Sequence, residues 1–176
     1  MEAVNADQVV VLPGNRNIIP VAEQLDALTT RAVRVVPSRS MPEGLAALMS
    51  YDPEASAEVN TVAMRRAAEA IAAGEVTQAV RASDTPAGPV VAGDWLAIAG
   101  RDGIVAVAPD VVVAATALLD RLVTDGRELV TVITGCDARP ADTAAITGWV
   151  ADHRPGVEVE VHDGGQPHYP LLFAAE

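Results

Sequence analysis

Lysine is absent from this sequence of 176 residues, and all twelve of its basic residues are arginine. A chain without lysine cannot form a Schiff base with a carbonyl substrate, and it has no phosphate-loop lysine to hold a nucleotide. We therefore exclude both lysine-dependent mechanisms for this chain taken alone.

Cysteine, aromatic residues and long apolar runs are also scarce. Cys136 is the only cysteine, so no disulfide can form within the chain, which fits a reducing compartment. No apolar run approaches the length of about 18 residues that is typical of a membrane-spanning helix. The first residues lack the pattern of a signal peptide. We expect a cytoplasmic protein with no membrane insertion.

Acidic residues, by contrast, are abundant. The 24 acidic and 12 basic residues give a formal net charge of −12. A nucleic-acid partner requires a basic face, so we expect none. An acidic surplus fits either plain solubility or a basic protein partner.

The first third of the chain has the pattern of an open α/β sheet. Residues 9–12 form an apolar run that predicts a strand buried on both faces, and a Pro-Gly turn follows it. Asn15 or Asn17 is expected to cap the next helix, which has Pro20 in its first turn. Residues 32–36 predict a second strand. Because sites in such sheets lie at the carboxyl ends of strands, the loop of Asn15 and Asn17 is a candidate site.

The loop after the second predicted strand carries Ser38 and Ser40. Ser40 and Glu43 have capping-box spacing, which predicts a helix that begins here. A hydroxyl beside a helix N-terminus suits a carboxylate or a phosphate, but a simple helix cap is the commoner explanation. Both interpretations stay open on spacing alone.

A long helix is predicted next, capped by Asp52 and ended by Gly74. Its buried stripe is predicted from helical spacing to contain Val59, Val62, Ala63, Ala67, Ala70 and Ile71. These elements form a first lobe over residues 1–74, with a mostly parallel, Rossmann-like sheet. The chain begins so close to a strand that we expect this lobe to lack its opening segment.

Residues 75–176 are predicted to form a second α/β lobe with a mixed sheet. Its elements are an alternating strand at 76–81, a turn at 83–89, a hairpin insertion at 94–107, a helix capped by Asp110, a strand at 129–133, a helix from Pro140, a strand at 157–161, a loop at 162–170 and a strand at 171–174. The Asp-Gly pair between two apolar runs is the signal for the hairpin.

Four parts of the sequence share their pattern with one known family. They are Leu12-Pro-Gly-Asn-Arg-Asn-Ile-Ile19 with Ala22-Glu-Gln24, Val36-Pro-Ser-Arg-Ser-Met-Pro-Glu-Gly-Leu-Ala-Ala47, Gly74-Glu-Val-Thr-Gln-Ala-Val-Arg81 and Val159-Glu-Val-His-Asp-Gly-Gly-Gln-Pro-His-Tyr-Pro170. Together they resemble the C-terminal region of the catalytic protein of bacterial fatty acid kinase, which is dihydroxyacetone-kinase-like. The resemblance covers essentially the whole chain. It implies two DegV-like lobes.

The resemblance also implies a role for this chain as one domain of a larger protein. That protein has an N-terminal kinase domain, where ATP and Mg²⁺ are expected to bind, and a central dimerisation domain with catalytic residues. Neither domain is in this chain, which therefore has no cofactor of its own. The implied partner is a basic DegV-like fatty acid-binding protein, whose acyl carboxylate the kinase phosphorylates.

The DegV-like resemblance assigns possible ligand positions as well. Ser38, Ser40 and His162 match the positions where such proteins hold a fatty acid carboxylate, and Asn15, Asn17 and Gln166 lie in the accompanying loops. A working pocket and a vestigial one are both open, and we favour vestigial loops because the bulky stretch 166–169 replaces a small glycine-rich loop.

The acidic residues that we expect to contact the partner lie in the second lobe. They are Asp137, Asp142, Glu158, Glu160 and Asp163. His153, His162 and His168 lack the i, i+4 spacing of a metal site, so we expect no metal. The neighbour of Cys136 is the carboxylate of Asp137, which argues against a nucleophilic thiol.

Three hypotheses follow from the sequence. The leading one is a non-catalytic docking domain of a fatty acid kinase with an acidic surface. The second is a small-molecule or fatty acid binding domain that uses Ser38, Ser40 and His162. The third, a phosphotransferase of small ketoses, is the weakest because the chain has neither a phosphate loop nor a lysine.

Overall fold

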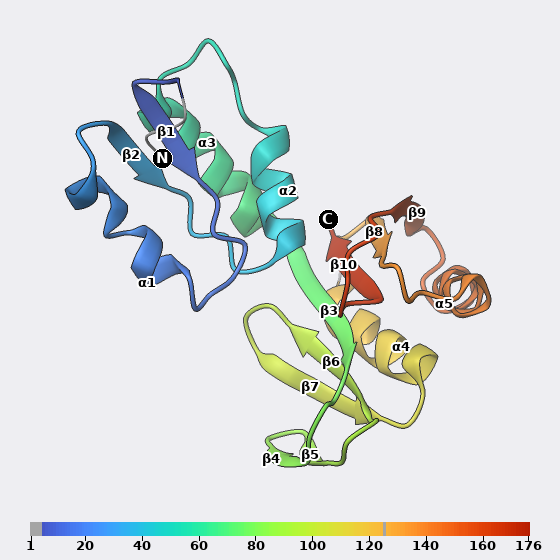
Figure 1. The fold of residues 1–176 in the computed structure, drawn as a ribbon. Helices are drawn as coiled ribbons and strands as arrows, with labels where there is room; N and C mark the ends of the chain where they lie inside the picture. Colours follow the sequence, from blue (N-terminus) through green and yellow to red (C-terminus); the bar gives the residue numbers. More distant parts are fainter. Residues whose placement is uncertain (1–4, 125) are drawn as a thin grey trace. The chain divides into compact units, whose positions relative to one another are not determined.

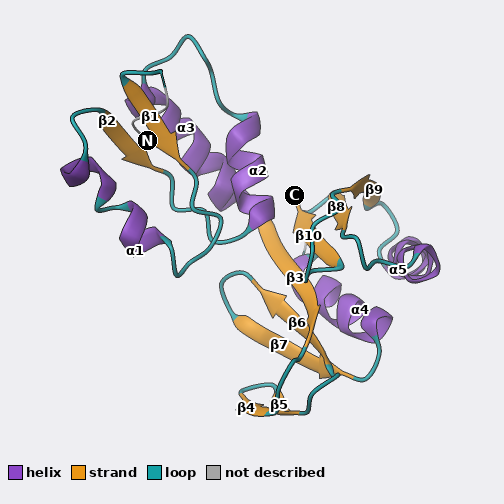
Figure 2. Ribbon diagram, in the orientation of Figure 1, coloured by secondary structure: helices purple, strands orange, loops and turns teal. Residues whose placement is uncertain are grey.

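The computed structural model describes residues 5–124 and 126–176. The chain divides into two compact units, unit 1 (Met1–Ile71) and unit 2 (Ala72–Glu176), each with its own internal contacts. Figure 1 labels their elements, and Figure 2 shows that both units contain helices and strands. The predicted α/β class is confirmed.

Unit 1 is built on a two-stranded parallel sheet. Its elements are β1 (Gln8–Val11), α1 (Ile19–Ala22), a 3-10 helix η1 (Leu25–Leu28), β2 (Ala32–Val35), α2 (Met41–Met49) and α3 (Ala57–Ala70). Gln8 lies opposite Ala32, and the register continues to Val11 and Val35. Both strands were predicted, and so was their parallel arrangement.

The prediction that β1 is buried on both faces is wrong. Gln8 is exposed, and Val9 to Val11 are only half-buried. A strand is enclosed on both faces when several neighbours and helices cover it, and this sheet has two strands among the described residues. The buried cluster of unit 1 is correspondingly small and consists of Val36, Ala47, Met64 and Ala68.

Helix α1 does not begin as the sequence predicted. Neither asparagine caps it: the cap position is Ile18, which makes no side-chain hydrogen bond. The Asn15 side chain instead accepts a hydrogen bond from the backbone N–H of Asn17 at 2.8 Å. Asparagine favours such local turns, and here that turn replaces the cap.

The capping of α2 by Ser40 is confirmed. Its hydroxyl oxygen accepts a hydrogen bond from the Glu43 N–H at 3.4 Å. The Glu43 carboxylate reaches back one residue further than a capping box requires and accepts from the Arg39 N–H at 2.6 Å.

Helix α3 differs from its prediction in both its start and its face. Ser56 caps it in place of Asp52. Val59 and Val62 of the predicted buried stripe are each 60% exposed, whereas Asn60 and Met64 are buried. Contacts between α3 and the preceding loop determine which face is buried. The Asn60 amide accepts from the Asp52 N–H at 2.8 Å and donates to the Asp52 carbonyl at 2.7 Å, which fixes the preceding loop and turns this face inward.

Unit 2 contains a six-stranded mixed sheet. Its elements are β3 (Ala72–Gln78), β4 (Ser83–Thr85), β5 (Gly88–Val90), β6 (Trp95–Ala99), β7 (Gly103–Ala108), α4 (Val111–Leu122), β8 (Leu129–Thr134), α5 (Pro140–His153), β9 (Glu158–Asp163) and β10 (Leu171–Ala175). The strand order is β7-β6-β3-β10-β8-β9, and the predicted turn at 83–89 forms the separate hairpin β4-β5.

Gly74 lies inside β3, so the prediction that it ends a helix is wrong. A Cβ atom at this position would lie 2.9 Å from the Leu118 side chain and 3.0 Å from the Ile98 carbonyl oxygen. Gly74 therefore lets α4 approach the sheet closely. The proposed lobe boundary after residue 74 falls within this strand.

The Asp-Gly hairpin is confirmed as β6 and β7, with Gly103 at φ +79°. This hairpin pairs with β3 and extends the main sheet. The central strand β10 is buried along its length and is antiparallel to both β3 and β8.

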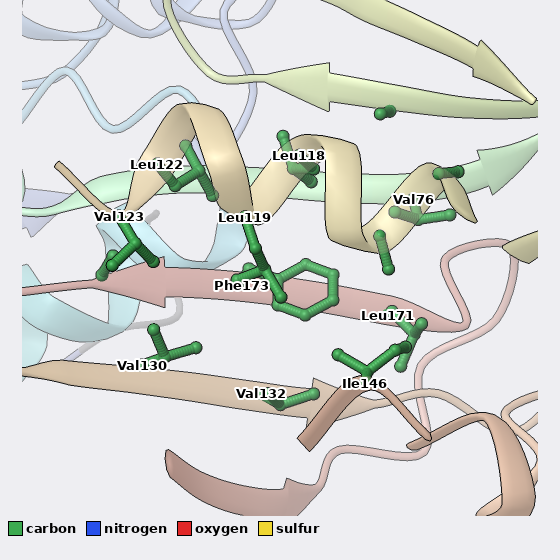
Figure 3. Packing of buried hydrophobic residues seen from close by; sticks show 14 of the residues in the cluster. Val76, Leu118, Leu119, Leu122, Val123, Val130, Val132, Ile146, Leu171 and Phe173 are labelled. Carbon is green, nitrogen blue, oxygen red and sulfur yellow. The ribbon is translucent and has the colours of Figure 1, made fainter. Parts of the chain in front are cut away.

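The core of unit 2 lies between this sheet and helices α4 and α5. Figure 3 shows Phe173 of β10 beside Leu119 of α4, with Ile146 of α5 nearby. Asp110 caps α4 as predicted: its carboxylate accepts from the Val112 and Val113 N–H groups. Burial of this apolar surface is the main stabilising contribution to unit 2.

Candidate functional site

In unit 1 the two candidate strand-end loops are joined by Ser38. This residue is fully buried, and its hydroxyl oxygen accepts a hydrogen bond from the Gly14 N–H at 2.9 Å. The bond connects the loop after β1 to the loop after β2. Ser40 is also buried and holds the first turn of α2, as described above. Both predicted ligand serines therefore have structural bonds within their own unit.

In unit 2 the corresponding loops are held by Gln166, which is 8% exposed. Its amide donates to the carbonyls of Ile133 and Tyr169 at 3.3 and 2.9 Å, and its backbone carbonyl accepts from the Cys136 N–H at 3.1 Å. The oxygen of the Gln166 side chain is buried without a hydrogen-bond partner. Gln166, which the resemblance placed in a ligand loop, is therefore packed inside unit 2 and holds these loops together.

Glycines make this packing possible. A Cβ atom at Gly135 would lie 2.5 Å from the Tyr169 carbonyl oxygen, and one at Gly164 would lie 2.3 Å from the Gln166 side-chain oxygen. Neither position has space for a side chain.

His162 lies in β9, although the sequence placed it in a loop. Its ring Nε2 is 3.4 Å from a carboxylate oxygen of Glu160. Because Ser38 and Ser40 belong to unit 1 and His162 to unit 2, the joint site that the resemblance implied stays a prediction. His168 adopts φ +69°, and its carbonyl accepts from the Thr77 hydroxyl at 2.7 Å.

Four of the five predicted partner-binding acids are exposed in unit 2. Glu158 and Glu160 alternate with Val159 on β9, so their side chains and that of His162 point to one face of this strand. Val159 packs on the other face, against the core. Among the described strands, β9 lies at one end of the strand order and pairs with β8 alone. The acids therefore follow a sheet edge, an arrangement that also discourages unwanted strand pairing.

Asp137 and Asp163 extend this acidic edge. β8 and β9 are parallel, and Thr134 lies opposite Asp163 at their carboxyl ends. Asp137 follows three residues after Thr134 and is exposed. The topology thus places both aspartates at the same end of the strand pair.

Asp142 is different, because it is engaged in an ion pair. Its carboxylate lies 2.7 Å from Arg139 Nε, and its side chain is 18% exposed. The hydrogen bond and the charge of Asp142 raise the pKa of Arg139 above its ordinary value. Asp142 is the least available of the five predicted acids.

The charge is divided unequally between the units. Unit 1 carries nine acidic residues and six arginines, a net charge of −3, whereas unit 2 carries fifteen and six, a net charge of −9. Three of the six arginines in unit 2 are in ion pairs with Asp102, Asp142 and Asp120. The acidic character of the chain therefore belongs mainly to unit 2.

Unit 1 contains a cleft that the sequence did not indicate. Its volume is about 600 Å³, and its lining includes Val9, Val10, Leu48, Tyr51 and Met64. Neither Ser38 nor Ser40 lines it. The polar residues Asp7, Gln8 and Asn60 also line it. The sequence does not reveal such a cleft, because its walls come from segments that are far apart in the chain.

Two negative observations apply to residues 5–124 and 126–176. No three His, Cys, Asp or Glu side chains in these ranges are grouped closely enough to hold a metal ion. No helix within the same ranges has the length and apolar character needed to cross a membrane.

Known proteins give the same architecture. The DegV family protein Cg2579 from Corynebacterium glutamicum has a TM-score of 0.66 at 15% identity, over 96% of this chain and 73% of that one. The fatty acid kinase (Fak) B3 protein of Streptococcus pneumoniae, loaded with linoleic acid, has a TM-score of 0.60 at 10% identity, over 98% and 72%.

Dihydroxyacetone kinase from C. freundii, in complex with AMP-PNP and Mg²⁺, has a TM-score of 0.64 at 16% identity, over 99% of this chain and 40% of that one. At these identities the likeness shows the fold alone. The predicted DegV-like and dihydroxyacetone-kinase-like architecture is confirmed.

Sequence comparison gives the family. An uncharacterized protein of Staphylococcus aureus strain MRSA252 is 33% identical over all 176 residues, which span 32% of that protein's length. The family model that describes the C-terminal region of FakA-like fatty acid kinase proteins matches residues 1–176. This chain therefore belongs to the FakA-like C-terminal family of fatty acid kinase.

Proposed function

We propose that this chain is the docking domain of a fatty acid kinase and that its unit 2 binds a basic DegV-like protein carrying a fatty acid. The observation that carries the proposal is the gathering of negative charge on unit 2, with Glu158, Glu160 and Asp163 along the edge strand β9 and Asp137 at its end. A DegV-like fatty acid carrier is a fitting partner because Fak B3 of S. pneumoniae binds linoleic acid.

The physical role of such a surface is to guide and orient the partner. Complementary charges speed diffusional encounter and reject partners of the wrong sign. Exposed carboxylates contribute mainly to the rate of association, so binding should weaken as salt screens them. Phosphorylation of the acyl carboxylate, with ATP and Mg²⁺, would take place in other domains of the longer protein. This chain would make no covalent bond itself.

The alternative is a small-molecule or fatty acid binding domain built on Ser38, Ser40 and His162. Two observations weigh against it. The hydroxyl oxygens of both serines already hold backbone N–H groups. Gln166 fills the loop region of unit 2 where a ligand would need room.

The experiment is a titration of this chain with lipid-loaded Fak B3 and with Cg2579, by calorimetry, at low and at raised NaCl. We expect binding that weakens as salt rises, and a substantial loss in the double variant Glu158→Gln, Glu160→Gln. The matched control neutralises two exposed acids of unit 1, Glu23→Gln and Glu54→Gln. An affinity that changes neither with NaCl nor in the double variant of β9 would reject the proposal.

A further inference from the structure

A second surface of opposite character lies on unit 1. A groove of about 390 Å³ runs between β2 and α3, and three of its seven lining residues are Arg34, Arg65 and Arg66. This volume is in the range of small-ligand sites. The chain has twice as many acidic as basic residues, yet a quarter of its arginines line this one groove.

These guanidinium groups are available for a ligand. Within the described residues, no hydrogen bond or ion pair engages the side chains of Arg65 or Arg66. Arg34 Nη1 donates to the Val33 carbonyl at 2.9 Å, and this is the one hydrogen bond of its guanidinium group to the described part of the chain. By comparison, Arg121, Arg139 and Arg154 of unit 2 are all paired with carboxylates.

The positions of the other lining residues define where an anion would sit. Glu58, Val62, Arg65, Arg66 and Glu69 follow one face of α3. Glu58 and Glu69 are about 16 Å apart along the helix axis, with the two arginines between them. Glu69 has an interaction of its own. The exposed Val62 adds an apolar wall.

We propose that this groove binds a phosphate group of a compact ligand through Arg34, Arg65 and Arg66. Arginine presents a planar fork of N–H donors that matches phosphate oxygens in bidentate pairs. A polyanion such as nucleic acid fits poorly, because Glu58 and Glu69 flank the arginines and the chain as a whole repels extended negative charge. A single phosphate fits at the arginines themselves, which lie about 10–12 Å from Glu58 and about 4.5–6 Å from Glu69 along the helix axis.

The test is calorimetric titration of the whole chain with inorganic phosphate in low-salt buffer. We expect saturable binding that weakens by about tenfold or more in Arg65→Ala, Arg66→Ala. Arg65→Lys, Arg66→Lys keeps the charge but removes the fork, so it should bind with intermediate affinity. The exposed Arg81→Ala in unit 2 is the matched control and should leave the affinity unchanged.

A second arm identifies the source of the phosphate. Sedimentation with phosphatidylcholine vesicles, with and without phosphatidic acid, reports binding to a lipid headgroup. Phosphate binding without vesicle binding assigns a soluble ligand, and vesicle binding that the double alanine variant loses assigns a lipid. The absence of both, or binding that survives the double alanine variant, would overturn the proposal. Because the substituted side chains are exposed, circular dichroism should confirm an unchanged fold.

Discussion

The two units of this chain both combine helices with strands but bury and charge their surfaces differently. Among the residues that the structure describes, the core cluster of unit 2 contains eighteen buried hydrophobic residues, whereas that of unit 1 contains four. Of the fourteen large hydrophobic residues that are exposed among the described positions, ten lie in unit 1. Unit 2 carries three times the net negative charge of unit 1.

This difference fits the proposed assignment of docking to unit 2. A unit with a complete core and an acidic edge has what a rigid, charge-steered docking surface requires. A unit with a small core and exposed apolar side chains, such as Leu48 and Met49 on α2, depends more on its surroundings for stability.

Phe173→Ala should cause the largest loss of stability. The ring is fully buried in the core beside α4, and its removal should lower the free energy of unfolding of unit 2 by about 3–5 kcal/mol. Chemical denaturation followed by tryptophan fluorescence measures this directly, because Trp95 and Trp149 both lie in unit 2. The exposed Val113→Ala on α4 is the control and should change stability by less than about 0.5 kcal/mol.

Met64→Ala should destabilise unit 1 by about 2 kcal/mol, at the low end for a buried methionine, since few core residues surround it. Hydrogen exchange of the α3 amides is the appropriate measurement, with the exposed Val62→Ala as control. We expect the tryptophan transition of unit 2 to stay in place. If Met64→Ala lowered the free energy of unfolding from the tryptophan transition as much as it lowered that from α3 exchange, the two units would unfold together. Their stabilities would then not differ in the way described above.

Ser38→Ala should cost about 1 kcal/mol, because the Gly14 N–H loses its acceptor in a half-buried loop. Thermal unfolding followed by circular dichroism would detect it. His162→Ala, at an exposed position, should have almost no effect. A silent Ser38→Ala would contradict a structural role for this serine.

The smallest effect should appear at high pH. Burial, and secondly the nearby Glu75 carboxylate, raise the pKa of the Tyr169 hydroxyl. The unfolded chain then loses this proton first, so the stabilising contribution is present below a pH of about 10 and is lost as pH rises through the higher folded pKa. Stability of the wild type should therefore fall more steeply above that pH than stability of Tyr169→Phe. Identical slopes would refute the shift.

Local signals in the sequence predicted much of this fold. Ser40 and Asp110 cap helices, and Gly103 closes a hairpin, because each depends on neighbouring residues alone. The buried face of α3 could not be predicted, since the contacts of Asn60 with the preceding loop decide it. Gly74 was assigned wrongly because its role, to accommodate Leu118, depends on a residue far along the chain.

The candidate site was predicted unevenly. The shared face of Glu158 and Glu160 follows from strand alternation alone, whereas their contact with a partner stays a prediction. The limited availability of Asp142 was not, since its ion pair with Arg139 depends on the geometry of a helix start. The arginine groove was missed entirely, because Arg34 comes from a different element than Arg65 and Arg66.

Hydrogen exchange on the complex with a lipid-loaded DegV-like protein would show which unit contacts the partner. If unit 2 is the docking unit, the partner should protect the amides of β9 and of the turn around Asp137, and leave α2 and α3 of unit 1 unchanged. Protection confined to unit 1, with β9 exchanging as in the free chain, would contradict the account.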